Sequence, residues 1–413
     1  MTKQEFQQLC RQRIIYLDGA TGSNLMKAGM PVGVCPEQWI LEHEQALIDL
    51  QTAYIEAGTD ILYAPTFTAN RIKLKEYDLE DQIEEINTRL IKLSKTIAKD
   101  KALVAADLTM TGKQLKPMGP LDFEELVDIY KEQIQYAEKA GADLIVIETM
   151  MSLQETRAAA IAAMEVSRLP VMATLTFESD GRTLFGSDAK SAAITLSHLH
   201  VDAIGANCST GPDQMCRIIE AMAEVTDIPL IAKPNAGMPE IVNGEAVYNC
   251  PPEEFVALVP EMLKAGVALF GGCCGTTEEH IAALKAALKD AEYVRPAPEC
   301  LDLLPAATEK EAFFLPADAT HGAVLTADGD LEDKLSDAMD DEWPMVALKL
   351  ASWADVDALA DYQYMIRKPL CLICDDAELL EAGLRAYQGR ALYEGNLTED
   401  ALAPLVEKYG LLV

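Results

Sequence analysis

Short apolar segments rich in β-forming residues alternate with longer segments of helical apolar spacing along most of the chain. The predicted helices between the strands include Pro36–Ala57, Leu79–Lys99, Phe123–Ala140 and Pro252–Ala265. The eight predicted strands are Ile14–Ala20, Asp60–Thr66, Ala102–Leu108, Leu144–Met150, Val171–Phe177, Ala203–Cys208, Leu230–Asn235 and Ala268–Cys273. Eight strand–helix repeats predict an α/β fold in which a parallel sheet closes into a (β/α)8 TIM barrel.

An open doubly wound sheet is the alternative arrangement of the same elements. It would call for a glycine-rich phosphate loop after the first strand, where this chain has DGATGSNL, a different pattern. Polar residues also gather after the predicted strands, as in YLDGATG, IETM, ANCSTGP and GGCCGTT. Because barrel enzymes place their active sites at the carboxyl ends of the strands, this distribution favours the closed barrel.

The last third of the chain has its own periodicity after a segment of irregular pattern. We predict a barrel over residues 1–295, a linker over 296–340 and a small C-terminal α/β lobe over 341–413. The predicted order of the lobe is strand Met345–Leu350, helix Ala354–Met365, strand Leu370–Cys374, helix Glu378–Tyr387, strand Ala391–Glu394 and helix Thr398–Tyr409. Three such units are too few to close a barrel. We therefore expect a small open sheet, docked on the barrel or on the second subunit of a homodimer.

Charge and composition exclude several classes of partner. The formal net charge of -33 would repel nucleic-acid phosphates, so we expect no nucleic-acid partner. No apolar run approaches the roughly 20 residues of a membrane-spanning helix, and the N-terminal segment lacks the apolar region of a signal peptide. We therefore expect a cytoplasmic protein without membrane association. In that compartment the 10 cysteines are expected to be packed thiols, metal ligands or nucleophiles rather than disulfides.

Three cysteines lie at the carboxyl ends of two predicted strands. Cys208 ends the sixth strand, and Cys273 and Cys274 follow the eighth within GGCCGTT, where glycines let the backbone turn. These strands are near neighbours around a barrel, so the sulfurs can converge on one Zn²⁺ and leave a fourth position open for catalysis. A thiol bound there would lose its proton and become a nucleophile for a methyl group. Asn207 and Asn235 also lie at strand ends, and Asn235 could lend its side-chain oxygen to the metal when substrate is absent.

The alternative interpretation is that these three cysteines are small buried residues. That interpretation suffices for other cysteines, which we assign to packing or to the surface, namely Cys10, Cys35, Cys216, Cys250 and Cys300. Cys371 and Cys374 lie three residues apart in a predicted strand, so their side chains should point to opposite faces. We therefore expect them to share neither a metal nor a disulfide.

Two carboxylates end other strands, Asp18 the first and Glu148 the fourth. A carboxylate in a partly buried barrel mouth is costly unless a cation pairs with it. The ammonium group of a substrate could supply that cation, and so could an Arg or Lys elsewhere in the chain. The loop with Gly19 and Ala20 could offer backbone N–H groups to a substrate carboxylate. Together with zinc, these residues indicate a pocket for an amino acid that carries a thiol.

The same residues lie in motifs that resemble those of the homocysteine-binding methyltransferase family. The matching segments are LDGATG, CPEQW, EAGTDILYAPTFTANR, IETMMSLQE, FESDGRTLFGSD, GANCSTGP, KPNAGMP and GGCCGTT. The resemblance implies a barrel that holds Zn²⁺ on the three cysteines and transfers a methyl group to L-homocysteine to give methionine. It implies that Asp18 and Glu148 hold the amino group of the substrate. Its carboxylate would lie near Gly19, Ala20 and Thr66.

The last third departs from the simplest members of that family. Its segments PLCLICDDAELLEAGLRAYQG and LVEKYGLLV resemble the middle of a pterin-binding barrel, but the lobe is too short to close around a folate. The sequence also has no DxHxxG-type cobalamin loop. We therefore expect a separate methyl donor: a methylated corrinoid protein, a methyl-folate system or a small methylated sulfonium or ammonium compound. Two other functions remain open, a corrinoid-linked methyltransferase subunit acting on another thiol or amine, and a non-catalytic zinc- or thiol-binding protein.

Overall fold

A computed structural model describes residues 1–208, 212–242, 245–293, 298 and 302–413. Residues 209–211 of the ANCSTGP motif, Cys300 and the expected boundary at 295 and 296 lie outside the described residues. Within the described part, no helix is long and apolar enough to cross a lipid bilayer.

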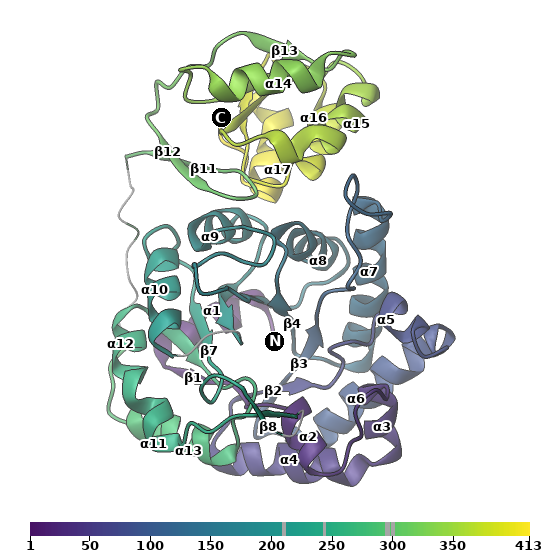
Figure 1. Ribbon diagram of the computed structural model, residues 1–413, viewed down its shortest axis with the longest axis vertical. Coiled ribbons are helices and arrows are strands. Elements are labelled where there is room, and N and C mark those ends of the chain that lie inside the picture. The colour runs from purple at the N-terminus through teal and green to yellow at the C-terminus, as the bar shows by residue number, and fades with distance from the viewer. Residues whose placement is uncertain (209–211, 243–244, 294–297, 299–301) are drawn as a thin grey trace.

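Eight parallel strands form the barrel wall in the order β1-β10-β7-β6-β5-β4-β3-β2 (Figure 1). A parallel bridge between Leu17 and Ile61 joins β1 to β2 and closes the ring. The strands are β1 (Ile15–Tyr16), β2 (Ile61–Ala64), β3 (Leu103–Leu108), β4 (Leu144–Met150), β5 (Val171–Leu175), β6 (Ala203–Asn207), β7 (Leu230–Lys233) and β10 (Val267–Phe270). All eight predicted strands are thus confirmed, and the closed barrel is confirmed over the open sheet. A hairpin of β8 (Glu240–Val242) and β9 (Glu245–Val247) follows β7.

Helices surround the barrel between successive strands (Figure 1). Gly58 and Gly141, with φ of 105° and 98°, end two of them in the left-handed conformation that favours glycine. The helices are α1 (Lys3–Gln12), α2 (Gly22–Lys27), α3 (Pro36–Glu42), α4 (Glu44–Ala57), α5 (Arg71–Lys75), α6 (Ile83–Ala98), α7 (Phe123–Ala140), α8 (Leu153–Val166), α9 (Ala189–Ser197), α10 (Pro212–Ala223), α11 (Pro252–Phe255), α12 (Val259–Lys264) and α13 (Glu278–Ala287).

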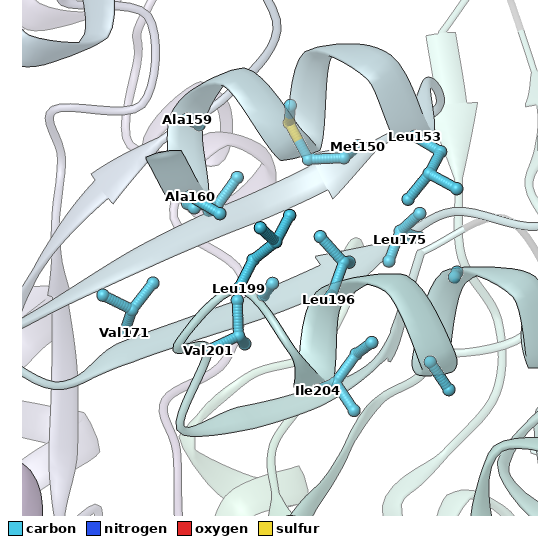
Figure 2. Packing of buried hydrophobic residues seen from close by; sticks show 14 of the residues in the cluster. Met150, Leu153, Ala159, Ala160, Val171, Leu175, Leu196, Leu199, Val201 and Ile204 are labelled. Atoms are coloured by element: carbon cyan, nitrogen blue, oxygen red, sulfur yellow. The ribbon is translucent and has the colours of Figure 1, made fainter. Parts of the chain in front are cut away.

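The outer faces of the strands pack against these helices. Figure 2 shows Ala160 of α8 and Leu196 of α9 over strands β4 to β6, beside Leu175 and Ile204. All four side chains belong to one buried cluster that extends around the barrel. Burial of a leucine or isoleucine side chain stabilises a fold by about 1.5–3 kcal/mol, so this layer fixes the strands in place.

Every second residue of a strand points into the barrel, where a lower apolar layer is followed by a polar one. The lower layer includes Ile15, Leu17, Ile61, Ala105, Val146, Met172, Ile231 and Leu269, packed with Phe6 and Cys10 of α1. Two residues further along β2, β3, β4 and β7 lie Tyr63, Asp107, Glu148 and Lys233. Because every second side chain of a strand points inward, these four polar side chains lie at the mouth of the barrel.

The segment 296–340, which we expected to be an irregular linker, contains regular structure instead. It carries a hairpin of β11 (Leu304–Ala307) and β12 (Ala312–Leu315), strand β13 (Val324–Thr326) and helix α14 (Leu331–Asp340). The prediction was wrong because acidic residues and glycines in this segment obscure a helical stripe. Leu331, Leu335 and Met339, at spacing i, i+4 and i+8, are all buried.

The C-terminal lobe is the expected small open sheet, with parallel strands in the order β13-β14-β15-β16. Its further elements are β14 (Val346–Lys349), α15 (Trp353–Tyr362), β15 (Leu370–Ile373), α16 (Ala377–Ala386), β16 (Leu392–Glu394) and α17 (Glu399–Tyr409). Leu412 adds a parallel bridge to Leu392. Cys371 and Cys374 lie in different buried clusters, in agreement with the prediction that they point to opposite faces.

The lobe docks on the barrel helices rather than over the barrel mouth (Figure 1). The fully buried Arg157 of α8 donates to Gln388 Oε1 at 2.6 Å and to the Leu384 carbonyl at 3.0 Å. Arg385 of α16 pairs with Glu124 of α7 at 2.6 Å. Docking on the barrel, one of the two expected arrangements, is therefore the one observed.

Candidate metal centre and adjoining pocket

Cys208, Cys273 and Cys274 converge at the carboxyl ends of β6 and β10. Their sulfur atoms all lie within 4.8 Å of one another, and the sulfurs of Cys208 and Cys274 are 4.0 Å apart. Tetrahedral zinc with bonds of about 2.3 Å would hold its sulfur ligands about 3.8 Å apart. Among the described residues, this is the one group of three such side chains with the spacing of metal ligands. The trio could therefore hold a metal ion.

The backbone around the cysteine pair depends on its glycines. A Cβ on Gly272 would overlap the Thr276 side chain, and Gly275 has a φ of 81° that favours glycine. The backbone of Cys208 is also in the left-handed region, with a φ of 61°. Strained backbone of this kind persists where the surrounding structure fixes it, and it clusters at functional sites.

The three sulfurs share negative charge unequally. Hydrogen bonds from Cys208 and then from Cys273 lower the pKa of the Cys274 thiol to about 3, whereas the contacts with Cys208 and Cys274 raise the pKa of Cys273 well above its usual value. The Tyr248 hydroxyl also hydrogen-bonds to Cys274. The protein alone thus favours one thiolate, and ionising all three thiols requires a cation between them.

A buried lysine neutralises both predicted carboxylates. Lys233 Nζ lies 3.2 Å from Asp18 Oδ1 and 3.0 Å from Glu148 Oε1, and 3.6 Å from the centre of the Tyr63 ring. Asp18 Oδ2 also accepts from the Tyr63 N–H at 2.7 Å. The Glu148 contact is an ion pair without hydrogen-bond geometry. The sequence left the source of the cation open, and for these two carboxylates it is a lysine of the chain.

The pKa values of the buried groups follow from their surroundings. Burial raises the pKa of Asp18 to about 6, despite the opposing effects of Lys233 and the Tyr63 N–H. Burial and the neighbouring Glu148 raise the pKa of Asp107 well above its usual value. Burial alone would lower the pKa of Lys233, but Glu148, Tyr63 and Asp18 raise it well above its ordinary value. These shifts favour the charged form of Lys233 and the neutral form of Asp107.

The cysteines and the charged cluster line one cavity of about 360 Å³ at the barrel mouth. Its volume is within the range of small-molecule sites. Its charged lining residues are Asp18, Glu37, Asp107, Glu148 and Lys233, and its larger apolar lining residues are Leu25, Met30, Pro36, Ile40, Pro65 and Phe67. Of the predicted site residues, this cavity brings together Asp18, Gly19, Ala20, Glu148 and the three cysteines.

Asn207 lies behind the cavity and connects two of its walls. Its Oδ1 accepts from the Thr149 N–H at 3.1 Å, and its Nδ2 donates to the Thr149 hydroxyl at 2.7 Å and to Cys273 Sγ at 3.7 Å. The pairing of β4 with β5 shifts in register between Ile147 and Met150, and Thr149 has a φ of 58°. Such an irregularity changes the direction in which side chains point, and here it lies next to Glu148.

Thr66 and Asn235 lie outside the lining of the cavity. The Thr66 hydroxyl donates to the Asp107 carbonyl at 2.9 Å and accepts from the Asp107 N–H at 3.0 Å, so it fixes the end of β3. Asn235 is buried. The N–H of the next residue, Ala236, donates to the Cys274 carbonyl, so Asn235 lies beside the cysteine pair. The Oδ1 of Asn235 has no hydrogen-bond partner among the described residues.

Sequence reasoning missed Tyr63, Asp107, Lys233 and Tyr248. The first three had a usable signal, since each lies two residues after an inward apolar residue of a strand. A lysine at such a position is almost never buried without a partner, so Lys233 could have been predicted to meet a carboxylate. Tyr248 follows the β8–β9 hairpin, where no periodicity indicates the direction of a side chain.

Comparisons with known proteins agree with this geometry. Residues 15–288 match the family described as Homocysteine S-methyltransferase. The methionine synthases of Mycobacterium leprae (strain TN) and Mycobacterium tuberculosis (strain ATCC 25618 / H37Rv) are each 30% identical, over 295 and 294 residues. These matches cover 67% of this chain but 24% and 25% of those proteins, so the chain spans about a quarter of their length.

Solved structures contain the same barrel. The metallated form of the homocysteine methyltransferase MmuM from Escherichia coli matches with a TM-score of 0.57 and 21% identity. The match covers 68% of this chain and 98% of that chain. This likeness shows the fold of the first two thirds of the molecule.

Proposed function

Because the chain belongs to the homocysteine S-methyltransferase family, we propose that it is a zinc-dependent S-methyltransferase that converts L-homocysteine to methionine. The observation that carries the proposal is the convergence of Cys208, Cys273 and Cys274 on the wall of a cavity that also holds a buried charged cluster. One end of the cavity suits a metal-bound thiol, and the other suits the charged groups of an amino acid.

The donor set fits zinc. Three thiolates at this spacing are ligands that Zn²⁺ prefers, and they leave one position for a further ligand. In the proposal, the Oδ1 of Asn235 is that ligand when no substrate is present, which is consistent with its being buried and without a hydrogen-bond partner among the described residues. Zinc, when bound, lowers the pKa of an entering thiol so that its sulfur is a thiolate at neutral pH.

The chain's own residues hold and orient the substrate in this proposal. Asp18 and Glu148 supply negative charge near its ammonium group, with Lys233 between them. Gly19 is the backbone donor that we assign to its carboxylate. The Ala20 N–H already donates to the Thr276 hydroxyl at 3.1 Å, so Ala20 positions the loop.

Methyl transfer then needs a donor from outside the chain. The substrate thiol gives up its proton, and a sulfur lone pair forms the new bond to the methyl carbon. The bond between that carbon and the donor breaks, and its electron pair stays on the donor. A methylated corrinoid protein, a methyl-folate system and a small sulfonium or ammonium compound each meet this requirement.

Zinc-edge X-ray absorption on metal-loaded protein tests the proposal, with and without L-homocysteine. We expect a change from three sulfurs and one nitrogen or oxygen to four sulfurs when L-homocysteine is added. L-cysteine, which is one methylene shorter, is the comparison compound. A spectrum that L-homocysteine leaves unchanged, or protein that takes up no stoichiometric zinc, would contradict the proposal.

A further inference from the structure

Asp107 lines the cavity, and among the described residues it pairs with no Lys, Arg or His within ion-pair distance. It is 6% exposed and lines the same cavity as Glu148 and the three cysteines. Its Oδ1 is buried and has no hydrogen-bond partner among the described residues. A buried polar atom without a partner is costly, and such atoms occur where a ligand completes the site.

Three other carboxylates line the cavity, and they differ in how many hydrogen bonds they accept. Both oxygens of Glu37 accept hydrogen bonds, from Thr68 and from Cys35. Asp18 accepts from Lys233 with one oxygen and from the Tyr63 N–H with the other, so both of its oxygens are occupied. Glu148 Oε1 lies 3.0 Å from Lys233 Nζ but accepts no hydrogen bond. Asp107 Oδ1 and Glu148 Oε1 are therefore carboxylate oxygens of the cavity that are buried without a hydrogen-bond partner among the described residues.

Building on the proposed function, we propose that Asp107 and Glu148 together receive the ammonium group of the substrate, and that Asp18 acts through Lys233 as a positioning residue. Asp107 thus becomes a specificity residue for an α-amino thiol. An ammonium group has three N–H donors, enough to serve both free acceptor oxygens and one further acceptor.

The fixed position of Lys233 supports this assignment. A substrate ammonium could reach Asp18 only by displacing the lysine, whose Nζ is enclosed by Asp18, Glu148 and the face of the Tyr63 ring. Separating a buried ion pair is strongly unfavourable. The space beside Asp107 needs no such displacement, because no cation of the chain occupies it among the described residues.

The raised pKa of Asp107 is consistent with its binding the substrate ammonium group. Burial and Glu148 raise its pKa, which favours the neutral acid and avoids the cost of a second buried charge beside Glu148. An incoming ammonium favours the ionised form, so binding would turn a neutral acid into a charge-assisted acceptor. The Thr66 hydroxyl holds the Asp107 backbone from both sides, which keeps the carboxyl in place for the ligand.

Two thiols that differ only in the ammonium group test the proposal. L-Homocysteine and 4-mercaptobutanoate have the same chain, thiol and carboxylate, and their affinities for the zinc-loaded full chain can be measured by calorimetry. The variant is Asp107→Asn, which has nearly the shape of the protonated acid and should fold normally. The control is Asp202→Asn, because Asp202 is also 6% exposed but precedes β6 at the opposite end of the barrel and pairs with Lys3.

We expect the wild type and Asp202→Asn to bind L-homocysteine at least about tenfold more tightly than 4-mercaptobutanoate, the size of a charge-assisted hydrogen bond. Asp107→Asn should reduce that ratio to about twofold or less by weakening L-homocysteine alone. Equal weakening of both thiols, or an unchanged ratio, would overturn the role of Asp107 and leave the proposed function standing. If the wild type binds neither thiol, the proposed function fails and the role of Asp107 fails with it.

Discussion

Asn207 and Thr149 are joined by two hydrogen bonds that cross from β6 to β4, with β5 between the two strands. Asn207 directly precedes Cys208, and Thr149 directly follows Glu148. The pair therefore connects the metal end of the cavity to its charged end. Both Thr149 and Cys208 have left-handed backbone, which the Asn207 side chain helps to hold.

Replacing Asn207 with Ala should weaken this connection and the metal site with it. We expect a loss of about 1–3 kcal/mol in the free energy of unfolding, because the Thr149 N–H is left buried without a partner. Zinc affinity, measured by competition with a chelator, should fall about tenfold, the effect of losing an outer partner of a metal site. Asn396→Ala, at an exposed asparagine, is the control. Unchanged zinc affinity in Asn207→Ala would show that the pair has no part in the metal site.

Removing one sulfur should abolish tight metal binding. Cys273→Ser leaves two thiolates, and we expect zinc affinity to fall more than about a hundredfold, beyond the usual effect of an outer partner. Cys10→Ala is the matched control, because Cys10 is buried under the barrel among apolar residues of α1 and the strands. Metal analysis after dialysis against a chelator measures the outcome. Full zinc retention by Cys273→Ser would mean that the sulfurs do not act as one site.

Replacing Lys233 with Met should destabilise the fold strongly at neutral pH. Asp18 and Glu148 would remain buried without a cation, which typically costs about 3–5 kcal/mol. The pKa of Asp18 is raised to about 6, so its protonation at lower pH relieves part of that cost and the loss should be smaller at pH 5 than at pH 8. Urea unfolding at both pH values measures it. Lys285→Met is the control, since Lys285 also lies over a tyrosine ring, that of Tyr16, but is exposed.

Asp107→Asn should stabilise the empty protein, and more so at high pH. The pKa of Asp107 is raised in the folded state, so its contribution is fully present below the unfolded pKa of about 3.9 and is lost as pH rises toward the folded pKa. The amide keeps the neutral state at every pH and avoids that loss. We expect the gain in unfolding free energy to be larger at pH 8 than at pH 5. An equal gain at both pH values would show that Asp107 does not titrate as its surroundings indicate.

In the wild type, Asp18 should also make the free energy of unfolding fall as pH rises. Its pKa of about 6 exceeds the unfolded value of about 3.9, so unfolding free energy should fall by about 2 kcal/mol as pH rises from 4 to 7 from this residue alone. Carbon-detected NMR titration of the Asp18 carboxyl checks the premise directly. A midpoint near 4 would contradict it.

The strands of the barrel and the convergence of the three cysteines could be predicted from the sequence because both depend on local pattern. Each of the eight strands is a short apolar run between helical segments, and closure follows from repeated strand–helix alternation. The segment before Met345 shows the limit of this reasoning. The buried stripe of α14 is only three residues long, and it lies among acidic residues that suggest irregular structure.

The sequence by itself determined that Cys208, Cys273 and Cys274 end strands at one rim, since strand ends and flanking glycines are local features. It also placed Asp18 and Glu148 at that rim. Only the tertiary structure decided which cation meets them, because Lys233 and Asp18 are 215 residues apart and come together through closure of the ring. The same closure leaves Asp107 without an ion-pair partner in the part of the chain that the structure describes. A charge balance inside a barrel depends on which side chains share one small buried volume, and that is a property of the folded wall rather than of any single strand.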